Sequence, residues 1–228
     1  HEFTLRQLCQ AHPKELSKWL EDDLHKLWFS LFLLLVGGAI YGWSLGFWRS
    51  PLQGVYVAIK FPLLLGLTAV GNALINGMLA QLLGAPISFR QSLLAVLMSF
   101  ALLAVILAAF TPLSVFLLYN LPPVESAQQS VGHSIYLLSN TLVIAFAGIV
   151  ANLQLYRLLQ HLCQQRQQAI QILFTWLSVN LFLGAQLSWN LRPFFGTPNL
   201  PVRFLREDPF SGSFYEAVFK LILNNLGA

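Results

Sequence analysis

Residues 93–121 read "LLAVLMSFALLAVILAAFTPLSVFLLYNL", and this run contains no Asp, Glu, Lys or Arg. An α-helix rises about 1.5 Å per residue, so about 20 apolar residues cross the roughly 30 Å hydrocarbon core of a bilayer. The run is longer than that, and a soluble domain offers few places to bury such a stretch. It therefore predicts a transmembrane helix and decides the class of the protein.

The composition of the whole chain agrees with this prediction. Of the 228 residues, 56% are hydrophobic and only 10% are charged, whereas soluble domains carry about 25% charged residues. Four more apolar runs have transmembrane length, and they cover residues 27–48, 55–83, 134–159 and 169–191. We therefore expect an all-α, polytopic membrane helical bundle of about five transmembrane helices, surrounded by the lipid bilayer.

Amphipathic segments flank this predicted transmembrane domain, which covers residues 27–191. Residues 1–26 form an N-terminal segment with an apolar stripe at Leu16, Trp19, Leu20 and Leu24, which suits a helix on the membrane surface or against a partner. Residues 192–228 form an extramembrane cap that ends in "SFYEAVFKLILNNL" (213–226), a helix too short to cross the membrane. Ser213 is in position to cap that helix.

The distribution of basic residues predicts the orientation. Lys and Arg occur before the first span and in the second and fourth loops, whereas the third loop, "NLPPVESAQQSVGH", has neither. The positive-inside rule then places the N-terminus in the cytoplasm, and five spans place the C-terminus outside.

Polar residues within the second span are the clearest candidates for a site inside the membrane. Lys60 stands in "AIKFPLLLGLT" beside Pro62, where its long side chain either reaches the headgroups or contacts a ligand or an anionic lipid. Asn72 and Asn76 lie one helical turn apart, on one face. Amides in hydrocarbon seek partners, so this pair indicates either helix packing or part of a polar path.

The segment after the fifth span mixes prolines, aromatic residues and charges. Pro193, Pro198 and Pro201 exclude a continuous helix. The segment either packs on its own bundle or presents a docking surface for a partner. The candidate docking residues are Arg192, Phe194, Phe195, Arg203 and Arg206.

Signatures of catalysis are missing from the sequence. It has no CxxCH, HExxH, GxSxG or phosphate-loop motif, and its two cysteines, Cys9 and Cys163, lack the spacing of a metal site. We therefore predict no catalytic residues, no metal and no cofactor. A net charge of only +4 without a basic block also argues against nucleic acid as a partner.

Two stretches carry a family resemblance. "IKFPLLLGLTAVGNALINGMLAQLLGAPISFRQSLLAVL" (59–97) and "FTPLSVFLLY" (110–119) resemble the core of Yip-family membrane proteins, in which a Lys-x-Pro begins a leucine-rich span. "LRPFFGTPNLP" (191–201) and "GSFYEAVF" (212–219) resemble the tail of bacterial membrane proteins that share this core. The resemblance implies five spans, a bacterial inner membrane and a non-catalytic scaffold role. Eukaryotic members of the family bind small GTPases and have an acidic N-terminal region. Residues 1–26 contain no counterpart of that region.

These observations lead to three functional hypotheses. The first is a non-enzymatic scaffold or accessory subunit of a larger membrane assembly, with other membrane protein subunits or further copies of the chain as partners. The second is a transporter or channel component that uses Lys60, Asn72 and Asn76. The third, with the least support, is an enzyme acting on lipid either through His133 in a loop or through Glu207 and Asp208 in the tail.

Overall fold

The computed structural model describes residues 24–82, 88–163, 165–196 and 200–225. It contains five long helices and one short one, and the described residues contain no strand. The helices are α3 (Leu24–Phe47), α4 (Pro51–Leu82), α5 (Phe89–Asn120), α6 (Gln129–Leu162), α7 (Arg166–Asn190) and α8 (Phe214–Asn225). The first five are long and apolar enough to cross a membrane. The predicted all-α bundle is confirmed, and its setting is a lipid bilayer.

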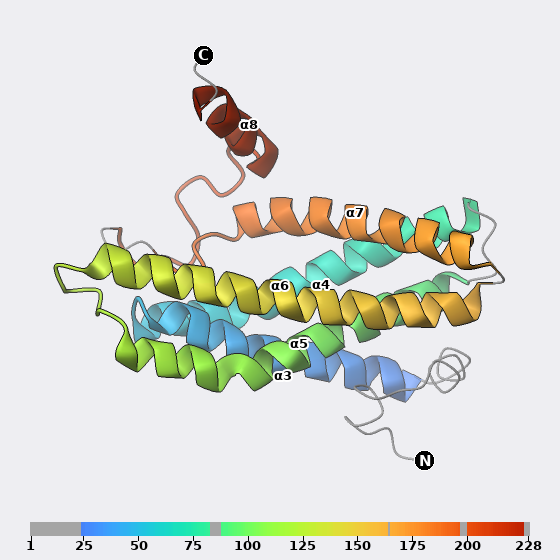
Figure 1. The fold of residues 1–228 in the computed structure, drawn as a ribbon, viewed down its shortest axis with the longest axis horizontal. Helices are drawn as coiled ribbons and strands as arrows, with labels where there is room; N and C mark the ends of the chain where they lie inside the picture. Colours follow the sequence, from blue (N-terminus) through green and yellow to red (C-terminus); the bar gives the residue numbers. More distant parts are fainter. Residues whose placement is uncertain (1–23, 83–87, 164, 197–199, 226–228) are drawn as a thin grey trace.

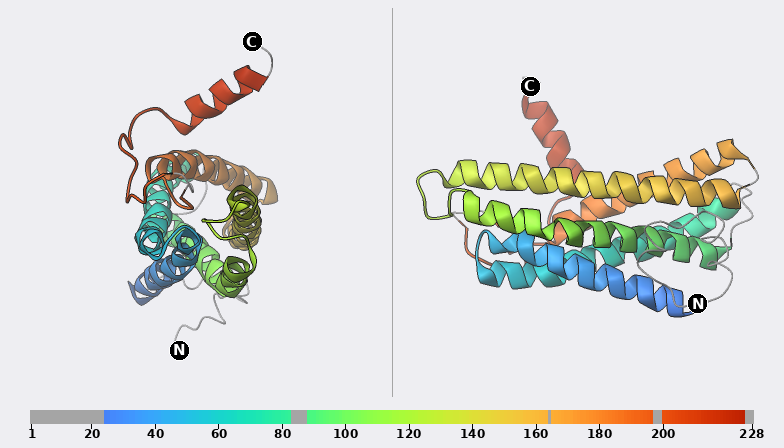
Figure 2. Two further views of the ribbon diagram at one scale, coloured as in Figure 1. Left: turned by 90° about the vertical axis from the view of Figure 1, so that its left-hand side faces the viewer. Right: turned by 60° about the horizontal axis from the view of Figure 1, so that its bottom comes forward.

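The five long helices run alternately up and down along one axis (Figure 1). In the view along that axis, α3, α4 and α5 pack together, α6 lies beside α5, and α7 lies beside α4 (Figure 2). One end of the bundle holds the α3–α4 and α5–α6 turns and the segment after α7. The opposite end holds the starts of α3, α5 and α7 and the ends of α4 and α6.

Helix starts follow local capping chemistry. Pro51 opens α4, where its missing N–H removes no helical hydrogen bond. Ser88 caps α5: its Oγ accepts from Gln91 N at 3.3 Å, while its own N–H donates to Gln91 Oε1 at 2.9 Å. These starts lie four residues before the predicted ones at 55 and 93, because apolar length alone does not reveal the polar first turn of a helix.

Glycine allows α3 and α4 to approach closely. A Cβ atom on Gly42 would lie 2.6 Å from Val57 O and 2.8 Å from Phe61 Cβ. A Cβ atom on Gly46 would lie 2.5 Å from Gln53 O. Backbone contact of this kind is what small residues provide in membranes, where water supplies no hydrophobic force between helices.

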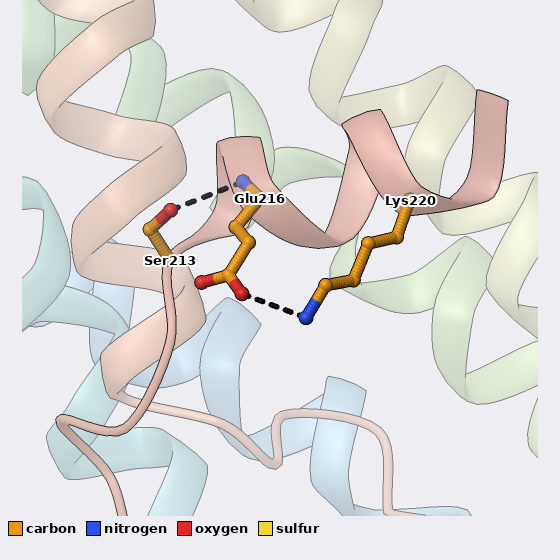
Figure 3. Close-up of polar contacts among 3 residues, drawn as sticks. All are labelled: Ser213, Glu216 and Lys220. Atoms are coloured by element: carbon orange, nitrogen blue, oxygen red, sulfur yellow. Dashed lines mark hydrogen bonds and ion pairs between the residues drawn. The ribbon is translucent and has the colours of Figure 1, made fainter. Parts of the chain in front are cut away.

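The terminal helix α8 stands apart from the bundle and crosses its long axis (Figures 1 and 2). Tyr215 ties its start to α7, donating from Oη to Phe182 O at 2.7 Å while the two rings stack. Figure 3 shows the first turns of α8, where Ser213 is the N-capping residue. Glu216 N donates to Ser213 Oγ at 3.0 Å, and Lys220 Nζ donates to Glu216 Oε1 at 2.7 Å. The predicted terminal helix and its serine cap are present, whereas most of the predicted N-terminal segment, residues 1–23, lies outside the described residues.

Candidate functional site

Lys60 lies inside the bundle, completely shielded from solvent. Its ammonium donates to two backbone oxygens of the segment after α7, Pro193 O and Phe204 O, the latter at 2.8 Å. The same ammonium stands 5.5 Å from the ring centroids of Phe194 and Phe204. Instead of reaching outward to headgroups, Lys60 therefore binds carbonyls and aromatic faces that its own chain supplies.

We call the described residues between α7 and α8 (191–196 and 200–213) the cap. Two further side chains hold it, one from the first turn of α4 and one from the α3–α4 turn: Gln53 Nε2 donates to Pro193 O at 2.9 Å, and Arg49 Nη2 donates to Leu200 O at 3.0 Å. Gly196 has a φ of +73°, and a Cβ atom there would lie 2.8 Å from Arg49 Cγ. Glycine at this position thus lets the cap backbone pass directly over the arginine stem.

Aromatic side chains of the cap face the bundle. The Phe194 ring meets Phe61 edge-on at 6.4 Å between centroids, and the Phe195 ring meets Tyr136 in the same way at 6.2 Å. Both phenylalanines pack against the buried core. Of the five candidate docking residues, these two therefore pack on the bundle of their own chain.

The other three candidate docking residues, Arg192, Arg203 and Arg206, line one cavity of about 450 Å³. Arg49 and Gln53 line it from the side of the bundle, and Glu207 and apolar cap residues complete it. The cavity thus lies among four arginines and one glutamate, where the cap meets the α3–α4 turn.

Contacts with Trp189, the penultimate residue of α7, and contacts within the cap fix these arginines. Arg192 donates from Nε to Trp189 O at 3.1 Å and lies over the Trp189 ring at 3.3 Å; Arg206 lies 5.2 Å from the same ring. Burial, together with the neighbouring Arg206 charge, lowers the pKa of Arg192 from its ordinary value. The hydrogen bond and charge of Arg203 lower the pKa of Glu207, which keeps that carboxylate ionised.

Asn72 and Asn76 form a separate polar pair. Both are buried in α4, and Asn76 Nδ2 donates to Asn72 Oδ1. They lie at least 12 residues beyond Lys60, or roughly 18 Å along the helix. The structure therefore does not bring the three predicted intramembrane residues into one site.

A second polar cluster links three helices of the bundle. Asn140 Oδ1 accepts from Tyr41 Oη at 3.0 Å and from Ser114 Oγ at 2.7 Å, and its Nδ2 donates to Tyr136 O at 2.9 Å. Tyr136 Oη in turn donates to Ser44 O at 2.6 Å. These bonds join α3, α5 and α6, so the cluster holds the helices together.

Residues named for a lipid-directed enzyme do not form a reactive pair. His133 lies in the first turns of α6 with its ring 5.3 Å from that of Trp48, whereas Glu207 belongs to the cap and pairs with Arg203. Among residues 24–82, 88–163, 165–196 and 200–225, no group of three His, Cys, Asp or Glu side chains is placed to hold a metal ion.

Sequence reasoning missed Arg49 and Gln53. Their signal was topological: the first and fifth spans end on the same side of a bundle of alternating helices, so the α3–α4 turn and the cap had to meet. Compared with known proteins, the chain matches no family model, no curated protein and no solved structure. The resemblance to the Yip family stays a prediction.

Proposed function

We propose that this protein is a non-enzymatic integral membrane protein that serves as a scaffold or accessory subunit of a larger membrane assembly. The observation that carries this proposal is how the chain uses its buried polar side chains. Lys60 holds the cap, Asn72 holds Asn76, and Asn140 joins three helices. These groups serve to hold parts of the chain to one another at separate levels of the bundle.

The same observation favours a scaffold over a transporter or channel component. A transport path needs polar groups that exchange partners with a passing substrate. Lys60 and the two asparagines, which the transporter hypothesis requires, are bonded within the protein and lie in separate places along α4. That hypothesis stays the alternative.

The assignment as a subunit rests on α7. This helix is the least apolar of the five candidate spans, and it is also the one least covered by the rest of the chain. Its buried residues are Ala169, Ile172 and Trp176. A lone bundle would shelter its least apolar helix from lipid, so we propose that a transmembrane helix of another membrane protein packs on the outer face of α7.

Site-specific photocrosslinking in native membranes tests the proposal. A photoreactive residue replaces Leu181, which is exposed on α7, or Ile40, which is exposed on α3 and serves as the matched control. We expect a discrete adduct with one other membrane protein from position 181 and none from position 40. An adduct of the chain with itself would replace the accessory subunit by a homo-oligomer, and lipid adducts alone at both positions would contradict the proposal.

We also propose a bacterial inner membrane, with the N-terminus in the cytoplasm and the C-terminus outside. Lys26, Arg90, Arg157 and Arg166 lie toward the end of the bundle where α3 starts, which supports this orientation. The arginines at the opposite end of the bundle count against this orientation under the positive-inside rule. These arginines line the cavity, so we propose that they serve that cavity instead of setting the orientation.

A further inference from the structure

The cavity between the cap and the α3–α4 turn combines features that recognise an anion. Arg49, Arg192, Arg203 and Arg206 line it, with Glu207 as the one carboxylate among the lining residues. The lining residues thus carry four positive charges and one negative charge. We propose that this cavity binds a phosphate group.

The chemistry of the lining selects phosphate among anions. Guanidinium groups present their N–H donors in a planar fork that matches two oxygens of a phosphate. Several arginines on one cavity suit a tetrahedral anion with several oxygens better than they suit a single carboxylate. The volume of about 450 Å³ lies within the range of small-molecule sites, about 300–1,000 Å³, and leaves room for a group attached to the phosphate.

Unpaired polar atoms give independent support. Within the described residues, the buried Nε of Arg206 and the buried Oε1 of Gln53 have no hydrogen-bond partner. Leaving such atoms unpaired costs about 1–3 kcal/mol each. The Arg206 N–H suits a phosphate oxygen, and the Gln53 oxygen suits a hydroxyl of the attached group, so both fit the chemistry of a phosphate ester.

The geometry of the lining is fixed before any ligand binds. The backbone carbonyls of Leu200 and Trp189 hold Arg49 and Arg192, and those of Pro209 and Ser211 hold Arg206. Gln53 is fully buried and is held by Pro193 O. Since these side chains are already ordered, binding loses little of their conformational entropy.

Two sources could supply the phosphate. The cavity lies at the end of the bundle that carries Trp48, Tyr56 and Trp189, residue types that favour the headgroup layer. A phospholipid headgroup can reach that layer from within the membrane, and a soluble phosphate or phosphomonoester can reach it from the water. Both would use the same arginines.

Thermal unfolding of the purified chain in dodecyl maltoside micelles, which contain no phosphate, separates these sources. One arm titrates inorganic phosphate, with sulfate and chloride at matched ionic strength. The other arm adds phosphatidylglycerol to the micelles. We expect at least one arm to raise the Tm: a rise with inorganic phosphate indicates a soluble source, and a rise with phosphatidylglycerol indicates a lipid headgroup.

Matched variants decide whether the cavity is responsible. Arg203 contacts the exposed Glu207, so Arg203→Gln disturbs the fold least, and Arg157→Gln makes the same charge change on α6 away from the cap. We expect Arg203→Gln to weaken binding roughly ten-fold or more, because a hydrogen bond to a charged group is lost. Arg203→Lys, which keeps the charge but not the fork, should lie between it and the native protein, and Arg157→Gln should bind as the native protein does.

Two results would overturn the proposal. The first is a Tm that neither arm raises, and the second is an equal loss of binding in Arg203→Gln and Arg157→Gln. Should Arg203→Gln fail to fold, Arg49→Gln removes a cavity arginine from the bundle side and is held to the same comparison. None of these outcomes depends on the scaffold proposal, since they are measured on the isolated chain.

Discussion

Replacing Lys60 by Met should release the cap while leaving the bundle intact. Methionine has a similar length and no charge, so the change removes the ammonium with little loss of packing. It deletes both hydrogen bonds from Lys60 Nζ, to Pro193 O and Phe204 O. Pro193 O keeps Gln53 as a donor, whereas Phe204 O loses the Lys60 bond.

The magnitude follows from these contacts. Two hydrogen bonds to a charged group contribute together about 3–6 kcal/mol, and the cost of burying the ammonium offsets part of that. We therefore expect the free energy of cap docking to fall by about 3 kcal/mol, which corresponds to roughly a 150-fold increase in the equilibrium constant for cap opening.

Hydrogen–deuterium exchange measures cap opening directly. In Lys60→Met, peptides spanning residues 191–206 should exchange roughly 100-fold faster, while peptides from α5 keep their native rates. Lys220→Met is the matched control, because Lys220 is exposed on α8 and pairs with Glu216. Exchange in the cap that rises less than three-fold, or that rises equally in the control, would refute the reasoning.

Three further predictions address packing, the polar cluster and the orientation. Gly42→Ala should destabilise the protein by about 1–3 kcal/mol in detergent unfolding, because its Cβ meets backbone on α4; Gly66→Ala, with open space around its Cβ, should be neutral or slightly stabilising. Asn140→Leu removes two bonds between helices and should lower the unfolding free energy by roughly 1–3 kcal/mol, and an unchanged value would show that the cluster is energetically silent. In a cysteine-free background, an impermeant maleimide added outside intact cells should label a cysteine at position 208 and not at position 90, and the reverse pattern would invert the proposed orientation.

The number and approximate place of the spans could be predicted from the sequence, because hydrocarbon selects for apolar length and that length is a local property. The terminal helix and its Ser213 cap were predictable for a similar reason, since capping depends on residues only three positions apart. The boundaries of α4, α5 and α6 were less accurate. Their polar first and last turns extend past the apolar runs.

The partners of Lys60 were not predictable from local patterns. Its carbonyl ligands lie 133 and 144 residues away in the sequence, in a segment without helical or strand periodicity. From the sequence, headgroups are the nearest source of polar contacts for a lysine near the start of a span. The structure supplies those contacts from the cap. Along the axis of the bundle, α7 ends short of the level at which α6 begins, and the cap follows α7 at that end (Figure 1).

The distance between Lys60 and its carbonyl partners has a consequence for biosynthesis. The ribosome delivers α4 to the membrane long before it completes residues 193 and 204, so the growing polypeptide carries an unmatched ammonium in its second span. Chains that terminate before residue 193 lack both carbonyl partners, so their ammonium keeps the full cost of a charge in hydrocarbon. Synthesis of the C-terminal region is therefore the step that completes the polar contacts of the second span.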